Sequence, residues 1–74
     1  MNTSQFTAII QREGDGFVAL CPEFDIASQG DTVEEARLNL NEAVELFLEH
    51  ASAVEIKERF HPETYISHLD IAVA

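Results

Sequence analysis

The chain has very few positive charges. Lys and Arg together number 4 against 14 Asp and Glu, which gives a formal net charge of −10 over 74 residues. A nucleic-acid backbone is bound by clustered Lys and Arg, whereas Arg12, Arg37, Lys57 and Arg59 are scattered along this sequence. The composition therefore argues against direct binding of DNA or RNA. It fits a surface that attracts a basic protein, or one whose acidity only keeps a small protein soluble.

The sequence also lacks the usual means of stabilising a small domain. Its single cysteine, Cys21, cannot form an intrachain disulfide, and no cluster with metal-ligand spacing is present. In a chain of 74 residues the core rarely supplies more than about 3–5 kcal/mol. We therefore expect one domain, residues 1–74, that is stabilised by forming a homo-oligomer or by binding a protein partner.

No targeting or membrane segment is recognisable. The first five residues carry no basic group and no apolar run, so we expect no signal peptide. No stretch approaches the roughly 20 apolar residues needed to span a bilayer. We expect a cytoplasmic protein without membrane contact.

Two alternating patterns near the N-terminus predict a β-hairpin. Phe6, Ala8 and Ile10 alternate with their neighbours, and residues 17–21 repeat the same period of two. Between these segments, residues 13–16 contain two glycines and an aspartate, which are typical of a tight reversal. Two antiparallel strands are the simplest arrangement.

A third strand and a helix start follow the hairpin. Pro22 ends the second strand because proline cannot donate to a ladder, and residues 26–29 are predicted to form a short third strand. Thr32 is the expected N-cap of a helix. Together with Glu35 it forms a T-x-x-E capping box, in which each side chain satisfies the other residue's backbone N–H.

The predicted helix, residues 33–53, has two different faces. An apolar stripe expected to cover the sheet consists of Val33, Ala36, Leu40, Ala43, Val44, Phe47, Ala51 and Val54. Leu38 and Leu46 fall outside the stripe, beside Glu42 and Glu45, and are candidate contact residues for a partner or a second subunit. The alternative is that they are ordinary surface leucines.

The C-terminal part predicts one more strand. His61 precedes a proline and ends any helical segment, and residues 68–73 place Leu69, Ile71 and Val73 on one face of an extended chain. The connection formed by residues 54–67 is long for so small a domain. The last strand could therefore pair within its own chain or be exchanged with a second subunit.

The acidic residues do not predict an active site. Asp15, Glu23, Asp25 and Asp31 are the candidates for a two-metal carboxylate cluster, but they lie mainly at turns, where Asp is ordinary turn or helix-cap chemistry. We therefore expect no enzymatic activity, no bound metal and no cofactor.

The cysteine and the histidines lead to the same expectation. Cys21 shares a strand face with Phe17 and Ala19, which predicts a core thiol rather than a nucleophile. His50, His61 and His68 have spacings that match no common metal-ligand signature. Separate structural roles are expected for the three histidines.

Several of these segments together resemble the HicB-like family, the antitoxin half of HicA and HicB toxin-antitoxin pairs. The residues that carry the resemblance are 14–19, Cys21-Pro22-Glu23, 30–36, and Leu40, Ala43 and Leu48. The resemblance covers roughly residues 5 to 50. It implies an α+β fold of order β-β-β-α-β, which is a partial ribonuclease-H-like fold without nuclease activity.

The resemblance also implies a partner. A HicB-like antitoxin would bind a small basic HicA-like mRNA interferase and mask its RNA-binding surface. Many such antitoxins continue into a C-terminal DNA-binding domain, for which this sequence has no residues, so only the toxin-neutralising role is expected. The alternative is an orphan structural or regulatory adaptor that assembles with itself and has no toxin partner.

Overall fold

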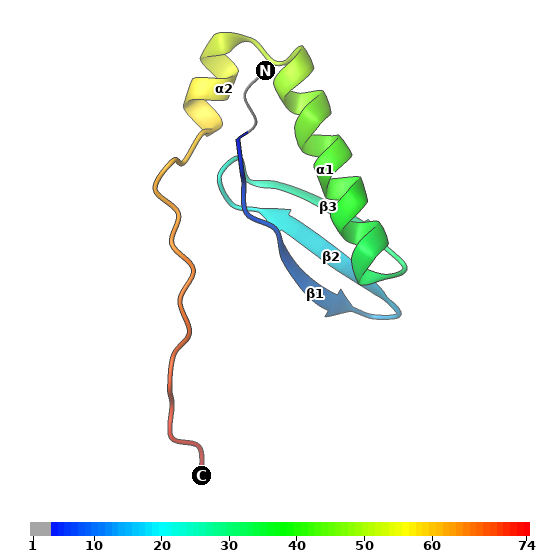
Figure 1. Cartoon of the computed structure of the whole chain (residues 1–74), viewed down its shortest axis with the longest axis vertical. Helices are drawn as coiled ribbons and strands as arrows, with labels where there is room; N and C mark the ends of the chain where they lie inside the picture. The colour runs from blue at the N-terminus through cyan, green and yellow to red at the C-terminus, as the bar shows by residue number, and fades with distance from the viewer. Residues whose placement is uncertain (1–3) are drawn as a thin grey trace.

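The structure, a computed structural model, describes residues 4–74 and has an α+β fold, as the sequence predicted (Figure 1). Three strands come first: β1 (Ile9–Glu13), β2 (Gly16–Cys21) and β3 (Ile26–Gly30). A long helix, α1 (Val33–His50), and a short helix, α2 (Ala53–Arg59), follow. None of the helices among residues 4–74 is both long and apolar enough to cross a membrane.

The strands form an antiparallel sheet in the order β1-β2-β3. Ile10 pairs with Ala19, and Ala19 pairs with Ser28, so these three residues share one face. The β1–β2 hairpin closes through Gly14 and Asp15, of which only Gly14 has a positive φ, at 59°. A glycine with positive φ at the first central position is the pattern of a type II′ turn, which matches the twist of a hairpin. The predicted hairpin is confirmed, although Phe6 and Ala8 precede the start of β1.

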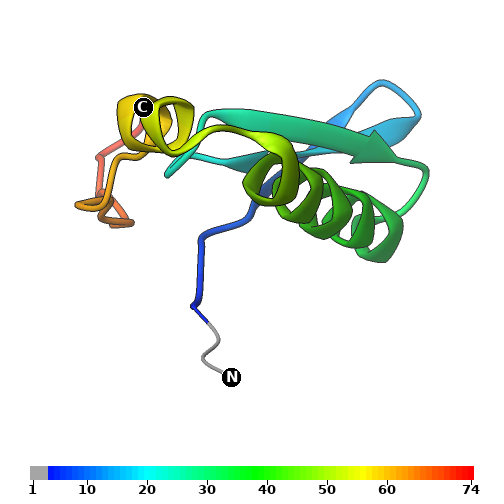
Figure 2. The same cartoon turned by 90° about the horizontal axis from the view of Figure 1, so that it is seen from above.

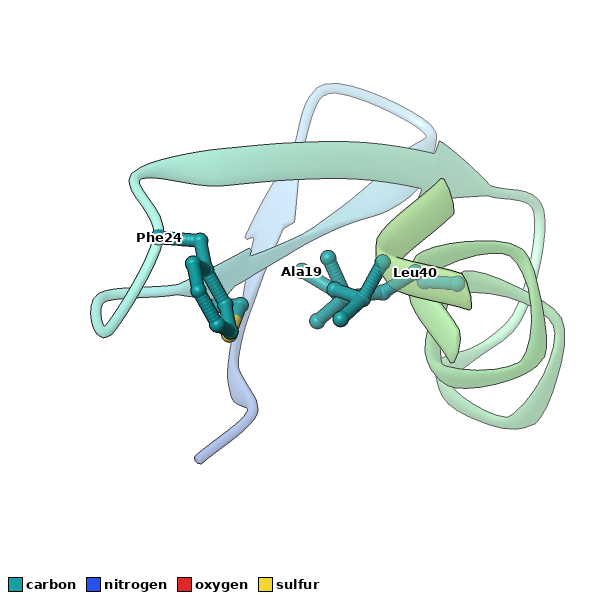
Figure 3. Close-up of a cluster of buried hydrophobic side chains, with 6 residues drawn as sticks. Ala19, Phe24 and Leu40 are labelled. Carbon is teal, nitrogen blue, oxygen red and sulfur yellow. The ribbon is translucent and has the colours of Figure 1, made fainter. Parts of the chain in front are cut away.

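The core lies between α1 and the face of the sheet that carries Ala19. Its buried residues are Ala19, Cys21, Phe24, Ala36, Leu40 and Val44. Figure 2 shows α1 against one face of the sheet, and Figure 3 shows Leu40 beside Ala19 with Phe24 farther along the same face. The placement of Cys21 in the core is confirmed. The predicted apolar stripe is confirmed at Ala36, Leu40 and Val44.

The predicted apolar stripe of the helix is wrong at both of its ends, where the side chains do not cover the sheet. Val33, in the first turn of α1, is 49% exposed, and Val54 is 65% exposed on α2. The helix also stops at His50 rather than near residue 53. Ser52 begins α2 by a full capping box with Glu55, which provides a competing helix start immediately after α1.

The N-terminus of α1 is capped partly as predicted. The Thr32 side chain accepts from the backbone N–H of Glu35 at 3.0 Å. The Glu35 carboxylate, however, accepts from the backbone N–H of Asp31 at 3.2 Å instead of from that of Thr32. The first contact satisfies an N–H group that the start of a helix leaves without an intrahelical partner, and the second ties the residue before the cap to the first turn.

An aromatic cluster joins parts of the chain that are distant in sequence. The Phe24 ring lies 5.0 Å from Phe6, 5.6 Å from Phe47 and 5.1 Å from Phe60, measured between ring centroids. Arg59 donates to the backbone oxygens of Phe24 at 3.1 Å and Asp25 at 2.8 Å. The turn after β2, the end of α1 and the end of α2 are therefore held together around one ring.

The predicted fourth strand, residues 68–73, does not form in this structure. Residues 60–74 have neither helical nor strand structure, and the sheet described here has three strands. Figure 1 shows this segment leaving α2 and running past the end of the sheet, away from the rest of the fold. A strand needs a neighbour to accept its backbone hydrogen bonds, and this segment does not reach one in its own chain.

We expect Gly30→Ala to lower the free energy of unfolding by about 1–3 kcal/mol, the usual range for an overpacked site. A Cβ on Gly30 would lie 2.6 Å from the backbone nitrogen of Ala36, so the first turn of α1 would have to move off β3. Urea denaturation at fixed protein concentration measures the loss.

Gly14→Asn is the matched control for this prediction. It keeps a residue that tolerates positive φ, and a Cβ at Gly14 meets nothing within 4 Å. If Gly14→Asn and Gly30→Ala lower the free energy of unfolding equally, the close approach of α1 to β3 at Gly30 is not the cause of the loss.

Candidate protein-binding face

One exposed side of α1 collects acidic and leucine residues. At 100° per residue, five positions point away from the sheet within one stripe, and we call this surface the outer face of α1: Leu38, Glu42, Glu45, Leu46 and Glu49. Leu38 is 54% exposed and Leu46 is 47% exposed, and the three glutamates are exposed as well. The structure therefore brings together all four candidate contact residues from the sequence on one surface.

The polar contacts around the outer face leave it strongly acidic. Arg37, which lies on the side of the helix next to buried Val44 rather than on the outer face, forms an ion pair with Glu34. The Asn41 side chain donates to the carboxylate of Glu45. Glu42, Glu45 and Glu49 lie at spacings of three and four residues, so their negative charges are close neighbours on the helix surface. An exposed row of like charges with two apolar side chains is suited to a basic partner that also offers an apolar contact.

Glu23 has a structural role that its sequence position did not reveal. Its side chain is only 8% exposed. Both carboxylate oxygens accept from the Thr7 backbone N–H, at 3.0 and 3.1 Å, and one also accepts from the Thr7 hydroxyl at 2.6 Å. Its backbone oxygen accepts from the His61 N–H at 2.7 Å. Glu23 therefore connects the segment before β1 to the segment after α2.

The ionisation of Glu23 follows from these contacts. Burial by itself disfavours the charged carboxylate, but the hydrogen bonds from the Thr7 hydroxyl and backbone N–H outweigh it. The net effect lowers the pKa of Glu23 below its ordinary value. The group is therefore a charged structural anchor at neutral pH. No local sequence signal pairs residue 7 with residue 23, which is why the sequence did not predict this contact.

Cys21 lies beside this carboxylate. Its thiol donates to Glu23 Oε1 at 3.5 Å and is buried in the core. Burial raises the pKa of the Cys21 thiol, and the nearby Glu23 carboxylate raises it further. A thiol held in its protonated form is a weak nucleophile. The environment of Cys21 fits a packed core residue.

The other candidate carboxylates and the histidines are separated in space. Asp15 lies at the tip of the hairpin, Asp25 is in the turn before β3 with φ of 56°, and Asp31 precedes the cap of α1. His50 ends α1, and His61 and His68 lie in the segment after α2. Within residues 4–74, no three His, Cys, Asp or Glu side chains are grouped closely enough to hold a metal ion.

Comparison with known proteins identifies the family. A UPF0150 protein of Helicobacter pylori is 34% identical over 68 residues, which covers 90% of this chain and 94% of that protein. The chain belongs to the UPF0150 family. No family model matches the sequence, and no solved structure matches it.

Two UPF0150 relatives from Synechocystis support the assignment. One is 46% identical over 46 residues and the other 44% identical over 48 residues. These matches cover 60% and 62% of this chain and 58% and 67% of the relatives. The chain thus spans under two thirds of the first of these proteins. The names of these UPF0150 relatives state a family and no activity.

Proposed function

We propose that this UPF0150 protein is a HicB-like binding module that neutralises a small basic HicA-like mRNA interferase by masking its RNA-binding surface. The observation that carries the proposal is the outer face of α1, where Leu38 and Leu46 are exposed among Glu42, Glu45 and Glu49. An RNA-binding surface is basic because it neutralises phosphates. A stripe of carboxylates with two apolar anchors complements such a surface in charge and in contact area.

The proposed mechanism is steric and electrostatic. The acidic surface, with a net charge of −10, accelerates encounter with a cationic partner. Leu38 and Leu46 then lose water against the partner, which slows dissociation. Occlusion of the RNA-binding surface requires no reacting group on this chain. Glu23 and Cys21 accordingly act within the fold, where the hydrogen bonds described above hold them.

The direct test begins with the genes beside this one: a short, basic reading frame that resembles a HicA-like interferase is expected, and its absence favours the orphan adaptor instead. The product of that frame is then purified and titrated against the full chain. We expect Glu42→Lys with Glu45→Lys to weaken binding by at least about tenfold and to reduce its salt dependence, because the attraction to the basic surface is reversed. We expect Leu38→Glu with Leu46→Glu to weaken binding similarly by removing the apolar anchors. Calorimetry at two salt concentrations measures both effects.

The matched control reverses two exposed charges away from the outer face, by Glu58→Lys with Glu63→Lys. It changes the net charge by the same amount as the Glu42 and Glu45 reversal. If it weakens binding as much, net charge rather than the outer face governs recognition. If the interferase arrests growth and co-expression of this chain gives no relief, the antitoxin function is wrong.

A further inference from the structure

The segment that follows α2 exposes far more apolar surface than a monomer normally leaves in water. Tyr65 is 84% exposed, Leu69 82%, Ile71 71% and Val73 91%. We call residues 60–74 the C-terminal arm. The radius of gyration is 14.4 Å, whereas a compact chain of this length has about 11 Å. A row of exposed aliphatic residues on an extended segment is typical of a surface that is covered by another molecule.

The arm has the pattern of a half-buried strand. Leu69, Ile71 and Val73 follow one another at every second position, so an extended backbone places all three on one face. Pairing would satisfy the backbone N–H and C=O groups of these residues, and one apolar face would become buried. The arm therefore needs a sheet edge that has an apolar surface beside it.

The sheet offers one such edge, at β1. Among the described residues, β1 pairs with β2 on one side and has no strand on the other. The edge at β3 is less open, because the Asn39 side chain donates to the backbone oxygen of Gln29 at 2.8 Å and the first turn of α1 lies directly against Gly30. Strand addition at β1 requires no displacement of α1.

A partly apolar groove lies beside the β1 edge. Helix α1 is packed mainly over β3 and β2, which leaves a groove on the β1 side. Its apolar lining includes Phe6, Ala8, Leu40 and Val44, and its polar lining includes Arg37 and Asn41. The register puts Ile10 on the same face as Ala19, toward α1. A strand added next to β1 with Leu69, Ile71 and Val73 on this face would extend the core between the sheet and α1.

The arm overshoots β1 of its own chain. The His61 N–H bonds to the Glu23 oxygen, and the Glu23 side chain bonds to Thr7, so the arm starts level with Thr7. At about 3.3 Å per residue, β1 ends about 20 Å beyond Thr7, at Glu13, whereas Leu69 lies about 26 Å beyond His61. Figure 1 shows this overshoot, since the arm continues past the sheet. The apolar part of the arm lies beyond the edge that would accept it.

We propose that residues 68–73 of one copy pair as a fourth strand with the β1 edge of a second copy, with Leu69, Ile71 and Val73 seated in its groove between β1 and α1. The groove and the arm belong to the same sequence, so two copies exchanging arms satisfy each other with one type of contact. The contact is made of backbone hydrogen bonds and aliphatic side chains. It does not rest on the proposed role of the outer face of α1.

Sedimentation of the full chain across a range of concentrations tests the exchange. We expect a dimer that Ile71→Asp weakens on the order of 100-fold or more, because a carboxylate would replace an aliphatic side chain between β1 and α1. Ala72→Asp adds the same charge on the opposite face of the strand and is expected to weaken the dimer less than about fivefold. High salt should strengthen the dimer, since both copies are acidic.

Amide hydrogen exchange on the same samples decides between the exchanged arm and its alternatives. We expect protection of residues 68–73 and of β1 that rises with concentration together with the dimer. A monomer with protected residues 68–73 would show pairing within one chain and overturn the proposal. A chain that stays monomeric with an unprotected arm, or a dimer that is indifferent to Ile71→Asp, would also overturn it.

Discussion

Replacing Phe24 by Ala is expected to leave most of the protein unfolded at room temperature. Phe24 is 2% exposed, and truncation of a buried Phe to Ala costs about 3–5 kcal/mol. The core of a domain this small supplies about the same amount in total. The ring contacts Phe6, Phe47 and Phe60, so its loss also loosens both ends of the chain from the fold. Circular dichroism with urea denaturation measures the fraction folded.

Phe17→Ala is the matched control for Phe24. Phe17 is also a phenylalanine on the helix side of the sheet, but it is half-buried and lies at the hairpin end of β2, under the Arg12 guanidinium. Its truncation should cost clearly less. If Phe17→Ala destabilises the protein as much as Phe24→Ala does, the aromatic cluster is not the centre of the fold. Both variants must be compared at one protein concentration, because self-association adds to apparent stability.

Replacing Glu23 by Gln is expected to lower the free energy of unfolding by about 1.5–3 kcal/mol, the range for hydrogen bonds to a charged group. Gln keeps the shape of the side chain but exchanges one carboxylate oxygen for an NH2 group. Thr7 donates to both oxygens of Glu23, so one of these donors then faces another donor. Thr7→Val, which removes only the hydroxyl donor, should cost less. Urea denaturation at neutral pH measures both losses.

The pH dependence gives an independent check on Glu23. Its pKa in the folded protein lies below the ordinary value of 4.5, so the folded state holds the proton less tightly than the unfolded state does. The contribution of Glu23 to stability is therefore fully present above about pH 4.5 and is lost as the pH falls through the folded pKa. We expect Glu23→Gln to lose less stability than the wild type over this interval. If the free energy of unfolding falls equally with pH in Glu23→Gln and in the wild type, Glu23 is not a charged, hydrogen-bonded group in the folded protein.

Glu58→Gln serves as the control for that pH series. Glu58 is exposed on α2. Its replacement by Gln removes one carboxylate without touching the Thr7 contacts. Its stability at neutral pH should stay within about 0.5 kcal/mol of the wild type, as is usual for a surface substitution. A loss comparable to that of Glu23→Gln would place the effect in the net charge of the chain instead of in the buried carboxylate.

Local features of the sequence determined a large part of the architecture. The alternation in residues 17–21 and Gly14 at the turn specify the β1–β2 hairpin, because strand faces and turn geometry depend on neighbouring residues. Thr32 specifies the start of α1 in the same way. The helical repeat placed Leu38 and Leu46 on the side away from the sheet, where the structure has them.

Tertiary structure alone decided how the two ends of the chain are held and where the C-terminal arm lies. The Phe24 cluster and the Glu23–Thr7 contact join residues that are far apart in sequence, and no short-range pattern encodes such pairs. Residues 68–73 have the alternation of a strand, but a strand forms only where a second edge accepts its hydrogen bonds. Their sequence determined the apolar face of the arm, whereas the path of the chain from His61 decided that its own β1 does not receive it.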